Sequence, residues 1–238
     1  MLKNKKIFIL GASSDIGVEV VKEFISNNWL VYAHYNKNIR SLKKLNLKNQ
    51  KLKLLQFDLS NFNKLDVFCK KISKIGFHSY INLVGYLDNK SFFNSKLNET
   101  VKSLKINTLL PIFIQRSLLK KMSKQNFGRI LNISSIGVKY GGSEFTFNYS
   151  FAKHALEYFP SIYKKLAKRN VLINILRVGV VNTKLLRKVK GKNIRKRVKL
   201  IPMQRMAKAK EISKMIYNLS SEKNTYISGE VITIAGGE

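Results

Sequence analysis

Short apolar runs alternate with longer amphipathic stretches along almost the whole chain, and this alternation constrains the fold most. Seven runs rich in β-branched residues predict strands at 6–10, 30–33, 52–57, 80–84, 129–133, 172–176 and 231–234. Helical periodicity lies between them, at about 15–27, 61–74, 96–124, 149–169 and 208–219. Continuously apolar strands separated by helices are typical of a parallel sheet buried on both faces. We therefore predict an α/β fold with a doubly wound sheet of about seven strands and helices on both faces.

The composition indicates one domain over residues 1–238. Apolar residues make up 45% of the 238 positions, there are only 3 Pro, and no linker-like segment interrupts the pattern. No apolar run approaches the roughly 18 residues of a membrane span, so we expect a cytoplasmic protein. The single Cys69 excludes an internal disulfide. With only three scattered histidines beside it, we expect no metal site.

Positive charge is the outlier of the composition. The chain has 45 Lys and Arg against 13 Asp and Glu, a formal net charge of +32. Such a field attracts anionic partners. A genome of low GC content would also enrich Lys and Asn, so the charge alone identifies no partner. The charge is densest at 184–199, where nine of 16 residues are basic. Because this stretch follows the strand at 172–176, we expect a basic substrate loop at about 184–200, beside the ligand crevice.

A glycine-rich turn connects the first predicted strand to the first predicted helix. It reads Gly11-Ala-Ser-Ser-Asp-Ile-Gly17. At this place in an α/β chain, such a turn brings backbone amides and a helix N-terminus to a pyrophosphate. We therefore expect a dinucleotide to be bound by Gly11, Ser13, Ser14, Asp15, Ile16 and Gly17.

The residues at the end of the second predicted strand indicate whether the dinucleotide is NAD(H) or NADP(H). This strand leads into Tyr35, Asn36 and Lys37. An acidic residue there would bind the ribose 2′-hydroxyl, but no carboxylate lies between Glu23 and Asp58. Lys37 and the nearby Arg40 favour a 2′-phosphate, so we predict NADP(H) over NAD(H). Because lysine is abundant, a chance placement of Lys37 remains the alternative.

The segment Tyr149-Ser-Phe-Ala-Lys153 places a phenol and an ammonium on one face of a helix. The ammonium would lower the phenol pKa and allow proton exchange with a carbonyl or an alcohol. The same spacing also occurs at Tyr86–Lys90, as expected by chance in a lysine-rich chain. Only Tyr149 begins a long predicted helix, and only it follows a strand that ends in serines, at 134–135.

In this order, the motifs resemble those of the short-chain dehydrogenases/reductases over nearly the whole chain. The matching segments are Gly11–Gly17, Asp58-Leu59-Ser, Asn82-Leu-Val-Gly85, Asn107, Asn132-Ile-Ser-Ser135, Tyr149–Lys153, Arg177-Val-Gly179-Val-Val181-Asn-Thr183 and Tyr226–Gly237. The resemblance implies a Rossmann-type fold and NAD(P)-dependent hydride transfer between nicotinamide and a carbonyl or secondary alcohol.

The resemblance also implies roles for single residues. Tyr149 would be the acid/base, Lys153 would lower its pKa and bind the nicotinamide ribose, and Asn107 would hold a water. Ser135 would bind the substrate oxygen, with Ser134 as the runner-up. Further cofactor contacts are implied for Asp58, Leu59, Asn82, Gly85, Gly179, Val181 and Thr183.

Four positions depart from the family pattern: Leu10, Asp15, Val84 and Val178. Asp15 replaces a glycine and places a carboxylate near the expected pyrophosphate, unless its side chain caps the helix instead. None of the four positions belongs to the catalytic set, so we expect an active enzyme.

The substrate stays open among three hypotheses. The first is a 3-oxoacyl group on acyl carrier protein, for which Arg129 and Arg169 resemble basic docking positions. The second is a sugar or other small anionic carbonyl in surface-polysaccharide synthesis, selected by the basic loop. The third is a retired enzyme scaffold that senses nucleotides or binds nucleic acid, which the intact catalytic set argues against, so we expect no specific nucleic-acid partner. Family resemblance also implies a homotetramer that pairs the helices near 96–124 and 149–169.

Overall fold

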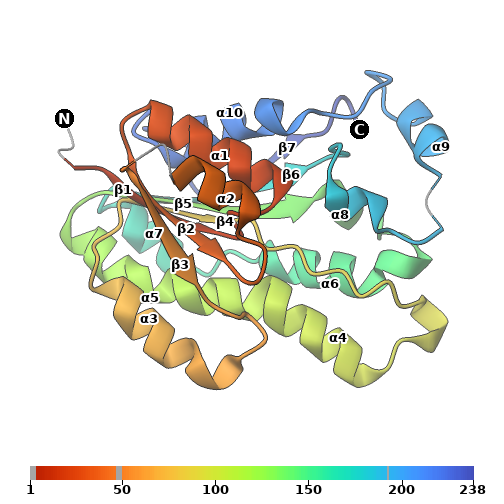
Figure 1. Cartoon of the computed structure of the whole chain (residues 1–238), viewed down its shortest axis with the longest axis horizontal. Coiled ribbons are helices and arrows are strands. Elements are labelled where there is room, and N and C mark those ends of the chain that lie inside the picture. The colour runs from red at the N-terminus through yellow and green to blue at the C-terminus, as the bar shows by residue number, and fades with distance from the viewer. Residues whose placement is uncertain (1–3, 47–49, 192) are drawn as a thin grey trace.

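Seven parallel strands form a single sheet in the order β3-β2-β1-β4-β5-β6-β7, as the computed structural model shows (Figure 1). The structure describes residues 4–46, 50–191 and 193–238. The strands are β1 (Lys6–Leu10), β2 (Leu30–Tyr35), β3 (Leu52–Gln56), β4 (Ser79–Asn82), β5 (Gly128–Ser135), β6 (Val171–Val178) and β7 (Val231–Ile234). The order reverses beside β1, so the predicted doubly wound, Rossmann-type sheet is confirmed.

Helices cover both faces of the sheet (Figure 1). On one face lie α1 (Asp15–Ser26), α2 (Arg40–Asn46) and α10 (Ala209–Ser220); on the other lie α3 (Leu65–Ser73), α4 (Leu97–Leu104), α5 (Leu110–Lys124), α6 (Phe147–Leu156) and α7 (Ile162–Ala167). Each face has its own apolar core: Val20, Phe24 and Ile216 belong to the first, and Phe68, Ile114 and Leu118 to the second. Strand side chains alternate between the two cores, which is why most residues of the central strands are apolar.

Several short elements lie between the main ones. Single turns of 3-10 helix occupy Phe62–Lys64, Phe92–Asn94, Ile136–Val138 and Glu144–Thr146, and two short helices follow β6, namely α8 (Lys184–Arg187) and α9 (Ile194–Lys199). The predicted helix at 96–124 is continuous in its path but contains a π turn at Lys105–Leu109 between α4 and α5. The sequence pattern did not predict α2, a short helix rich in lysine.

The prediction of one continuous helix at 149–169 is wrong. Helix α6 ends at Leu156, and α7 begins only at Ile162. Pro160 lies in the interruption. Proline has no N–H for the helical ladder and disfavours helical backbone at the preceding residue. The chain therefore turns after Leu156.

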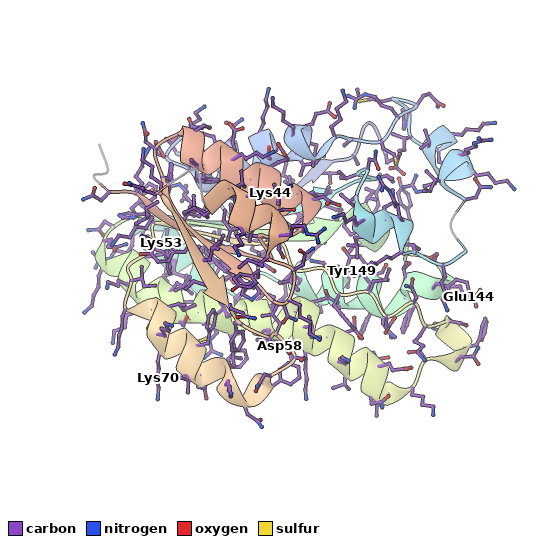
Figure 2. The ribbon with its side chains drawn as sticks, viewed as in Figure 1. Lys44, Lys53, Asp58, Lys70, Glu144 and Tyr149 are labelled. Carbon is purple, nitrogen blue, oxygen red and sulfur yellow. The ribbon has the colours of Figure 1, made fainter. Side chains whose placement is uncertain are left out.

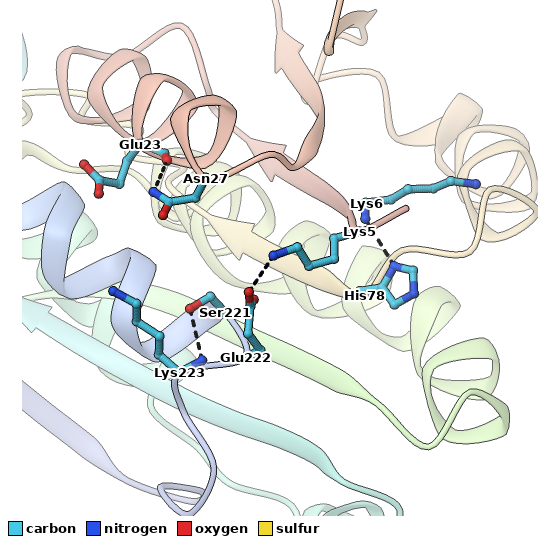
Figure 3. A network of polar contacts seen from close by, with 8 residues as sticks. All are labelled: Lys5, Lys6, Glu23, Asn27, His78, Ser221, Glu222 and Lys223. Atoms are coloured by element: carbon cyan, nitrogen blue, oxygen red, sulfur yellow. Dashed lines mark hydrogen bonds and ion pairs between the residues drawn. The ribbon is translucent and has the colours of Figure 1, made fainter. Parts of the chain in front are cut away.

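The amino ends of the strands lie at the side opposite the glycine-rich turn, and polar contacts tie them together (Figure 3). Lys5 forms an ion pair with Glu222, which follows α10. The backbone N–H of Lys6 donates to Nδ1 of His78 at 3.1 Å. Among the described residues, no helix has the length and apolar character needed to cross a membrane. The same residues contain no group of three or more His, Cys, Asp or Glu placed to hold a metal.

Candidate active site

A cleft of about 970 Å³ opens at the carboxyl ends of the strands. The loops after β1, β4, β5 and β6 form its walls, as expected for a doubly wound sheet. Eleven of the residues predicted from the sequence line it: Ser13, Ser14, Asp15, Ile16, Gly85, Ser135, Tyr149, Lys153, Gly179, Val181 and Thr183. The other predicted residues, Gly11, Gly17, Tyr35, Asn36, Lys37, Asp58, Leu59, Asn82 and Asn107, are not among the lining residues.

The glycine-rich turn directs the N-terminus of α1 toward the cleft. Gly11 has a φ of 78°, a conformation that favours glycine. A Cβ at Gly17 would lie 2.6 Å from the carbonyl oxygen of Ala12, so only glycine allows this close approach of the helix to the turn. The hydroxyl of Ser14 caps α1 by accepting from the N–H of Gly17 at 3.1 Å. A close backbone approach beside a helix N-terminus suits the pyrophosphate of a dinucleotide.

Asp15 contacts a segment 169 residues away. Its Oδ2 accepts a hydrogen bond of 2.6 Å from the backbone N–H of Lys184. Because Ser14 supplies the helix cap, the alternative of a capping Asp15 is not what the structure shows. The Asp15 carboxylate instead joins the glycine-rich turn to Lys184, the first residue of α8, and both residues line the cleft.

Tyr149, which is labelled in Figure 2, and Ser135 both line the cleft and are hydrogen-bonded to each other. Burial raises the pKa of the Tyr149 phenol to about 12, and a hydrogen bond with Ser135 opposes this rise. The pKa shift is opposite to the lowering expected from the sequence, because burial outweighs the hydrogen bond. The phenol is therefore held protonated at neutral pH, as a proton donor requires.

Lys153 is almost fully buried, with 1% of its surface exposed. Its Nζ donates to the carbonyl oxygens of Val84 at 2.8 Å and Ile133 at 2.6 Å, and lies 5.8 Å from the centre of the Tyr149 ring. Burial lowers the pKa of Lys153 to about 7, while the charge of Glu157 opposes this lowering. The ammonium therefore exchanges its proton near neutral pH.

The structure distinguishes the two serines at the end of β5. The hydroxyl of Ser134 donates to Oε1 of Glu157 at 2.6 Å. The hydroxyl of Ser135 contacts Tyr149 and accepts from the N–H of Gly137 at 3.2 Å. Of the two, Ser135 has the position from which a hydroxyl could reach an oxygen bound beside the phenol.

Glu157 is a residue of this site that the sequence analysis missed. Beyond its bond to Ser134, its carboxylate accepts from Nε of Arg177 at 3.0 Å and forms an ion pair with that guanidinium. It therefore ties α6 to the ends of β5 and β6. Glu157 follows Lys153 by four residues and so shares its helical face, and this spacing was the sequence signal that could have identified it.

Asn107 and Asn82 hold the loop after β4 from beneath the cleft. The side chain of Asn107, fully buried in the π turn, accepts from the N–H of Tyr86 at 2.7 Å and donates to its carbonyl at 2.9 Å. Asn82 donates to Asn132 at 3.2 Å and accepts from the N–H of Val84. Both residues fix the backbone that carries Gly85 and the carbonyl bound by Lys153.

The residues predicted to hold the adenosine end lie together past β2 and β3. Nδ2 of Asn36 donates to Oδ1 of Asp58 at 3.3 Å. Hydrogen bonds from Ser60, with the positive charge of Lys37, hold the pKa of Asp58 below its usual value. Lys37 is exposed and free to meet a further anion, whereas Leu59 belongs to the core.

Comparison with known proteins agrees with this geometry. A family model described as enoyl-(acyl carrier protein) reductase matches residues 11–238. The chain belongs to the short-chain dehydrogenase/reductase family. It is 30% identical to a 3-oxoacyl-[acyl-carrier-protein] reductase FabG of Aquifex aeolicus, over 97% of this chain and 86% of that protein. A FabG of Buchnera aphidicola subsp. Schizaphis graminum is 29% identical over 99% of this chain and 88% of its own length.

A solved structure extends the likeness. ElxO with NADP bound superposes with a TM-score of 0.83 at 25% identity, over 99% of this chain and 98% of that one. The chain is thus a short-chain dehydrogenase/reductase with the fold and the cleft of an NAD(P)-dependent oxidoreductase.

In this short-chain dehydrogenase/reductase, the basic segment 184–200 forms one wall of the cleft. Lys184, Lys190, Lys196 and Arg197 line the cleft. The N–H of Lys190 donates to Oδ1 of Asn89 at 3.2 Å, and Arg197 forms an ion pair with Glu238. Lys192 lies outside the described residues. The described residues of this segment therefore lie beside the cleft, and its role in binding a substrate stays a prediction.

Positive charge is nevertheless not confined to the cleft. Lys44, Lys53 and Lys70 lie on α2, β3 and α3, on elements other than those that carry Tyr149 and Glu144 (Figure 2). The cleft therefore shares its positive charge with the rest of the surface.

Arg129 does not have the exposure that docking of a carrier protein requires. It lies near the amino end of β5 and is only 2% exposed. Its guanidinium donates to the carbonyl oxygens of Asn224, Gly128 and Asn170, each at 2.8 Å. The resemblance to a docking position is therefore misleading for Arg129, whereas Arg169 is exposed.

Proposed function

We propose that the chain, acting as one domain over residues 1–238, is an NADP(H)-dependent reductase of 3-oxoacyl groups carried on acyl carrier protein. The observation that carries the proposal is the pairing of Tyr149 with Ser135 in a cleft that begins at the glycine-rich turn. Two curated relatives named 3-oxoacyl-[acyl-carrier-protein] reductase, similar over nearly the whole chain, support this substrate class.

The proposed chemistry divides between cofactor and protein. The nicotinamide supplies the hydride when bound, and the protein orients it and moves the proton. Tyr149, protonated at neutral pH, donates its proton to the carbonyl oxygen of the substrate. Ser135 donates a hydrogen bond to the same oxygen and stabilises its developing charge. Lys153, held by Val84 and Ile133, places a proton-exchanging ammonium beside the phenol ring and the expected nicotinamide ribose.

Asn107 has a supporting role in this proposal. It fixes the backbone of Tyr86, next to Gly85 on the cleft wall. We place the relay water of the family beside the π turn that contains Asn107, where it would connect Lys153 to solvent. The remaining contacts to the cofactor are proposed for Gly179, Val181 and Thr183, on the wall formed after β6.

We propose a preference for NADP(H) on the basis of Lys37. It is exposed just past β2, and its positive charge reaches Asp58. There it would attract a 2′-phosphate, with no carboxylate at the end of β2 to bind a 2′-hydroxyl instead. Lys37→Glu should reverse the preference: kcat/KM should fall for NADPH and rise for NADH. An unchanged ratio of the two values would overturn the assignment of Lys37.

A second candidate function is reduction of a small anionic carbonyl, such as a sugar derivative of surface-polysaccharide synthesis. The observation that favours it is the set of cations on the cleft wall, Lys184, Lys190, Lys196 and Arg197. The same cations suit a carrier-linked substrate, because acyl carrier proteins are acidic and a basic surface would steer them. The two candidates differ in whether the carrier is needed.

The distinguishing experiment is NADPH oxidation with one 3-oxoacyl chain presented on acyl carrier protein or on a small neutral thiol. We expect kcat/KM to be at least about tenfold higher with the carrier, which corresponds to about 1.4 kcal/mol. The double variant Lys190→Gln/Lys196→Gln should remove most of this advantage. Lys44→Gln/Lys53→Gln removes the same charge at two residues that do not line the cleft and should leave the advantage nearly intact.

The other outcomes of this assay are equally informative. Turnover of anionic sugar ketones, without turnover of either thioester, would favour the second candidate. No turnover of any carbonyl by folded protein would favour the retired scaffold. In that case, NADP(H) affinity and the salt dependence of DNA binding become the properties to measure.

We also propose that the chain assembles as a homo-oligomer, with a second copy covering the exposed face of α4, α5 and α6. Leu97, Val101, Phe113 and Phe151 expose apolar side chains there, each by at least 36%. The interruption between α6 and α7 shortens this face relative to the predicted helix. Light scattering after size exclusion, with Phe113→Glu as the disrupting variant, tests the assembly; a monomeric wild-type protein would refute it.

A further inference from the structure

One histidine lies directly beneath the glycine-rich turn. His34, near the end of β2, has only 2% of its surface exposed. Its Nδ1 lies 3.1 Å from the backbone nitrogen of Gly11, and its Nε2 lies 2.9 Å from the carbonyl oxygen of Phe57. A single ring therefore bridges the residue after β1 and the residue after β3.

The two partners define the protonation state of this ring. A backbone N–H can only donate, and a carbonyl oxygen can only accept. Nδ1 must therefore be the unprotonated acceptor for Gly11, and Nε2–H must be the donor to Phe57. The ring is neutral, in agreement with burial, which lowers the pKa of His34 to about 4.

Hydrogen bonds hold both the N–H and the carbonyl oxygen of Gly11. Its N–H donates to His34, and its carbonyl oxygen accepts from the N–H of Ser14 at 3.2 Å and from the Ser14 hydroxyl at 2.9 Å. The next N–H, that of Ala12, donates to the carbonyl oxygen of His34 at 2.9 Å. The carbonyl oxygen of His34 is thus bonded to Ala12, and the imidazole of the same residue is the acceptor for the N–H of Gly11.

We propose that His34 is a positioning residue for the cofactor: it holds Gly11, and through Gly11 the turn whose amides and helix N-terminus receive the pyrophosphate. The inference rests on the proposed binding of NADP(H). His34 does not itself touch the cofactor in this proposal. Its effect is on the path of the backbone between β1 and α1, so it should govern cofactor affinity more than the chemical step.

Two variants separate the two hydrogen bonds of the ring. In His34→Asn, the amide oxygen stands the same number of bonds from Cα as Nδ1 and can accept from Gly11. In His34→Gln, the amide nitrogen stands at the distance of Nε2 and can donate to Phe57, but Gly11 loses its acceptor. Each variant keeps one buried hydrogen bond, so a general loss of stability should affect both alike.

The test is the dissociation constant of NADPH, measured by titration calorimetry for wild type and both variants, with melting temperatures recorded beside it. We expect His34→Asn to stay within about threefold of wild type, and His34→Gln to bind at least about tenfold more weakly, a loss of about 1.4 kcal/mol. With a saturating carbonyl substrate, kcat at saturating NADPH should change little in either variant. Equal affinities for the two variants would overturn the positioning role.

The outcomes also separate this inference from the proposed function. A wild-type protein that binds no NADPH refutes both. A wild-type protein that binds NADPH, with both variants indistinguishable from each other, refutes only the role of His34. If neither variant folds, ¹⁵N NMR of the wild-type imidazole decides: the inference requires the Nε2–H tautomer and a coupling between Nδ1 and the Gly11 amide, and their absence overturns it.

Discussion

The carboxylate of Asp15 accepts a hydrogen bond of 2.6 Å from the backbone N–H of Lys184. This bond connects the glycine-rich turn after β1 with the basic segment after β6, and both segments line the cleft. A carboxylate at this position opposes a bound pyrophosphate through its charge, yet it anchors the wall that carries the cleft lysines. Asp15 therefore has two effects that substitutions can separate.

Asp15→Asn should keep the anchor and remove the charge. The amide oxygen can still accept from Lys184, while one negative charge leaves the neighbourhood of the pyrophosphate. At a separation of about 4 Å in a watery site, this is worth about 1 kcal/mol, or roughly a fivefold lower Kd for NADPH. Asp66→Asn, at an exposed position of α3, makes the same change in net charge and should leave the Kd unchanged.

Asp15→Ala should also remove the anchor. We expect its KM for the carbonyl substrate to rise several-fold above that of Asp15→Asn, because the basic segment loses its contact with the turn. Steady-state kinetics of the two variants at saturating NADPH measure this difference. Identical KM values in both variants would show that the hydrogen bond to Lys184 does not position the substrate wall.

Glu157 should influence the pH dependence of turnover through Lys153. The carboxylate raises the pKa of Lys153, against the lowering by burial. If the protonated ammonium is the active form, kcat/KM declines as pH rises through the pKa of Lys153. Glu157→Gln keeps an acceptor for Ser134 but removes the charge, so this decline should move to lower pH.

The control for this shift is Glu222→Gln, which removes a carboxylate that pairs with Lys5 at the opposite end of the sheet (Figure 3). Its profile of kcat/KM against pH should overlay that of wild type. An unshifted profile in Glu157→Gln would show that Glu157 is only a structural tie between α6, β5 and β6.

His34 should make the protein sensitive to acid. Its pKa is lowered from 6.5 to about 4 in the folded state, chiefly by burial, so folding favours the neutral ring. The contribution to stability is complete above pH 6.5 and is lost as pH falls toward 4, at up to about 1.4 kcal/mol per pH unit.

Urea unfolding at pH 7.5 and pH 5.0 measures this effect. Between the two values, wild type should lose about 2 kcal/mol more free energy of unfolding than His34→Asn, which carries no titrating ring. His78 is present in both proteins, so its contribution cancels. Parallel losses in the two proteins would show that the buried ring does not control the acid sensitivity.

The sequence predicted the sheet well because a strand that is buried on both faces appears in the sequence as a short run of apolar residues. All seven strands were placed by their apolar runs, with ends that differ by at most two residues, as at β5 and β6. Helix α2 was missed because its lysine-rich segment shows little apolar periodicity. The interruption after Leu156 was missed because the periodicity continues past Pro160, although proline was the available signal.

The candidate site was predictable where the residues that act together are also close together in the sequence. Tyr149 and Lys153 share a helical face, and the glycine-rich turn follows a strand. The contacts between distant segments could not be predicted, because no sequence pattern indicates them. Examples are the contact of Asp15 with Lys184 and that of His34 with Gly11. The exposure of Arg129 was likewise undetermined, since a basic residue after a glycine looks the same whether it lies on the surface or beneath a carbonyl cluster.

Turnover in Tyr149→Phe, compared with Tyr86→Phe, tests the central claim most directly. Both tyrosines precede a lysine by four residues, but only Tyr149 contacts Ser135 in the cleft. With a 3-oxoacyl substrate on acyl carrier protein, Tyr149→Phe should lower the rate of NADPH oxidation at least about 100-fold with NADPH affinity retained. Tyr86→Phe should stay near wild type. Full activity in Tyr149→Phe, or equal losses in both variants, would contradict the assignment of Tyr149 as the proton donor.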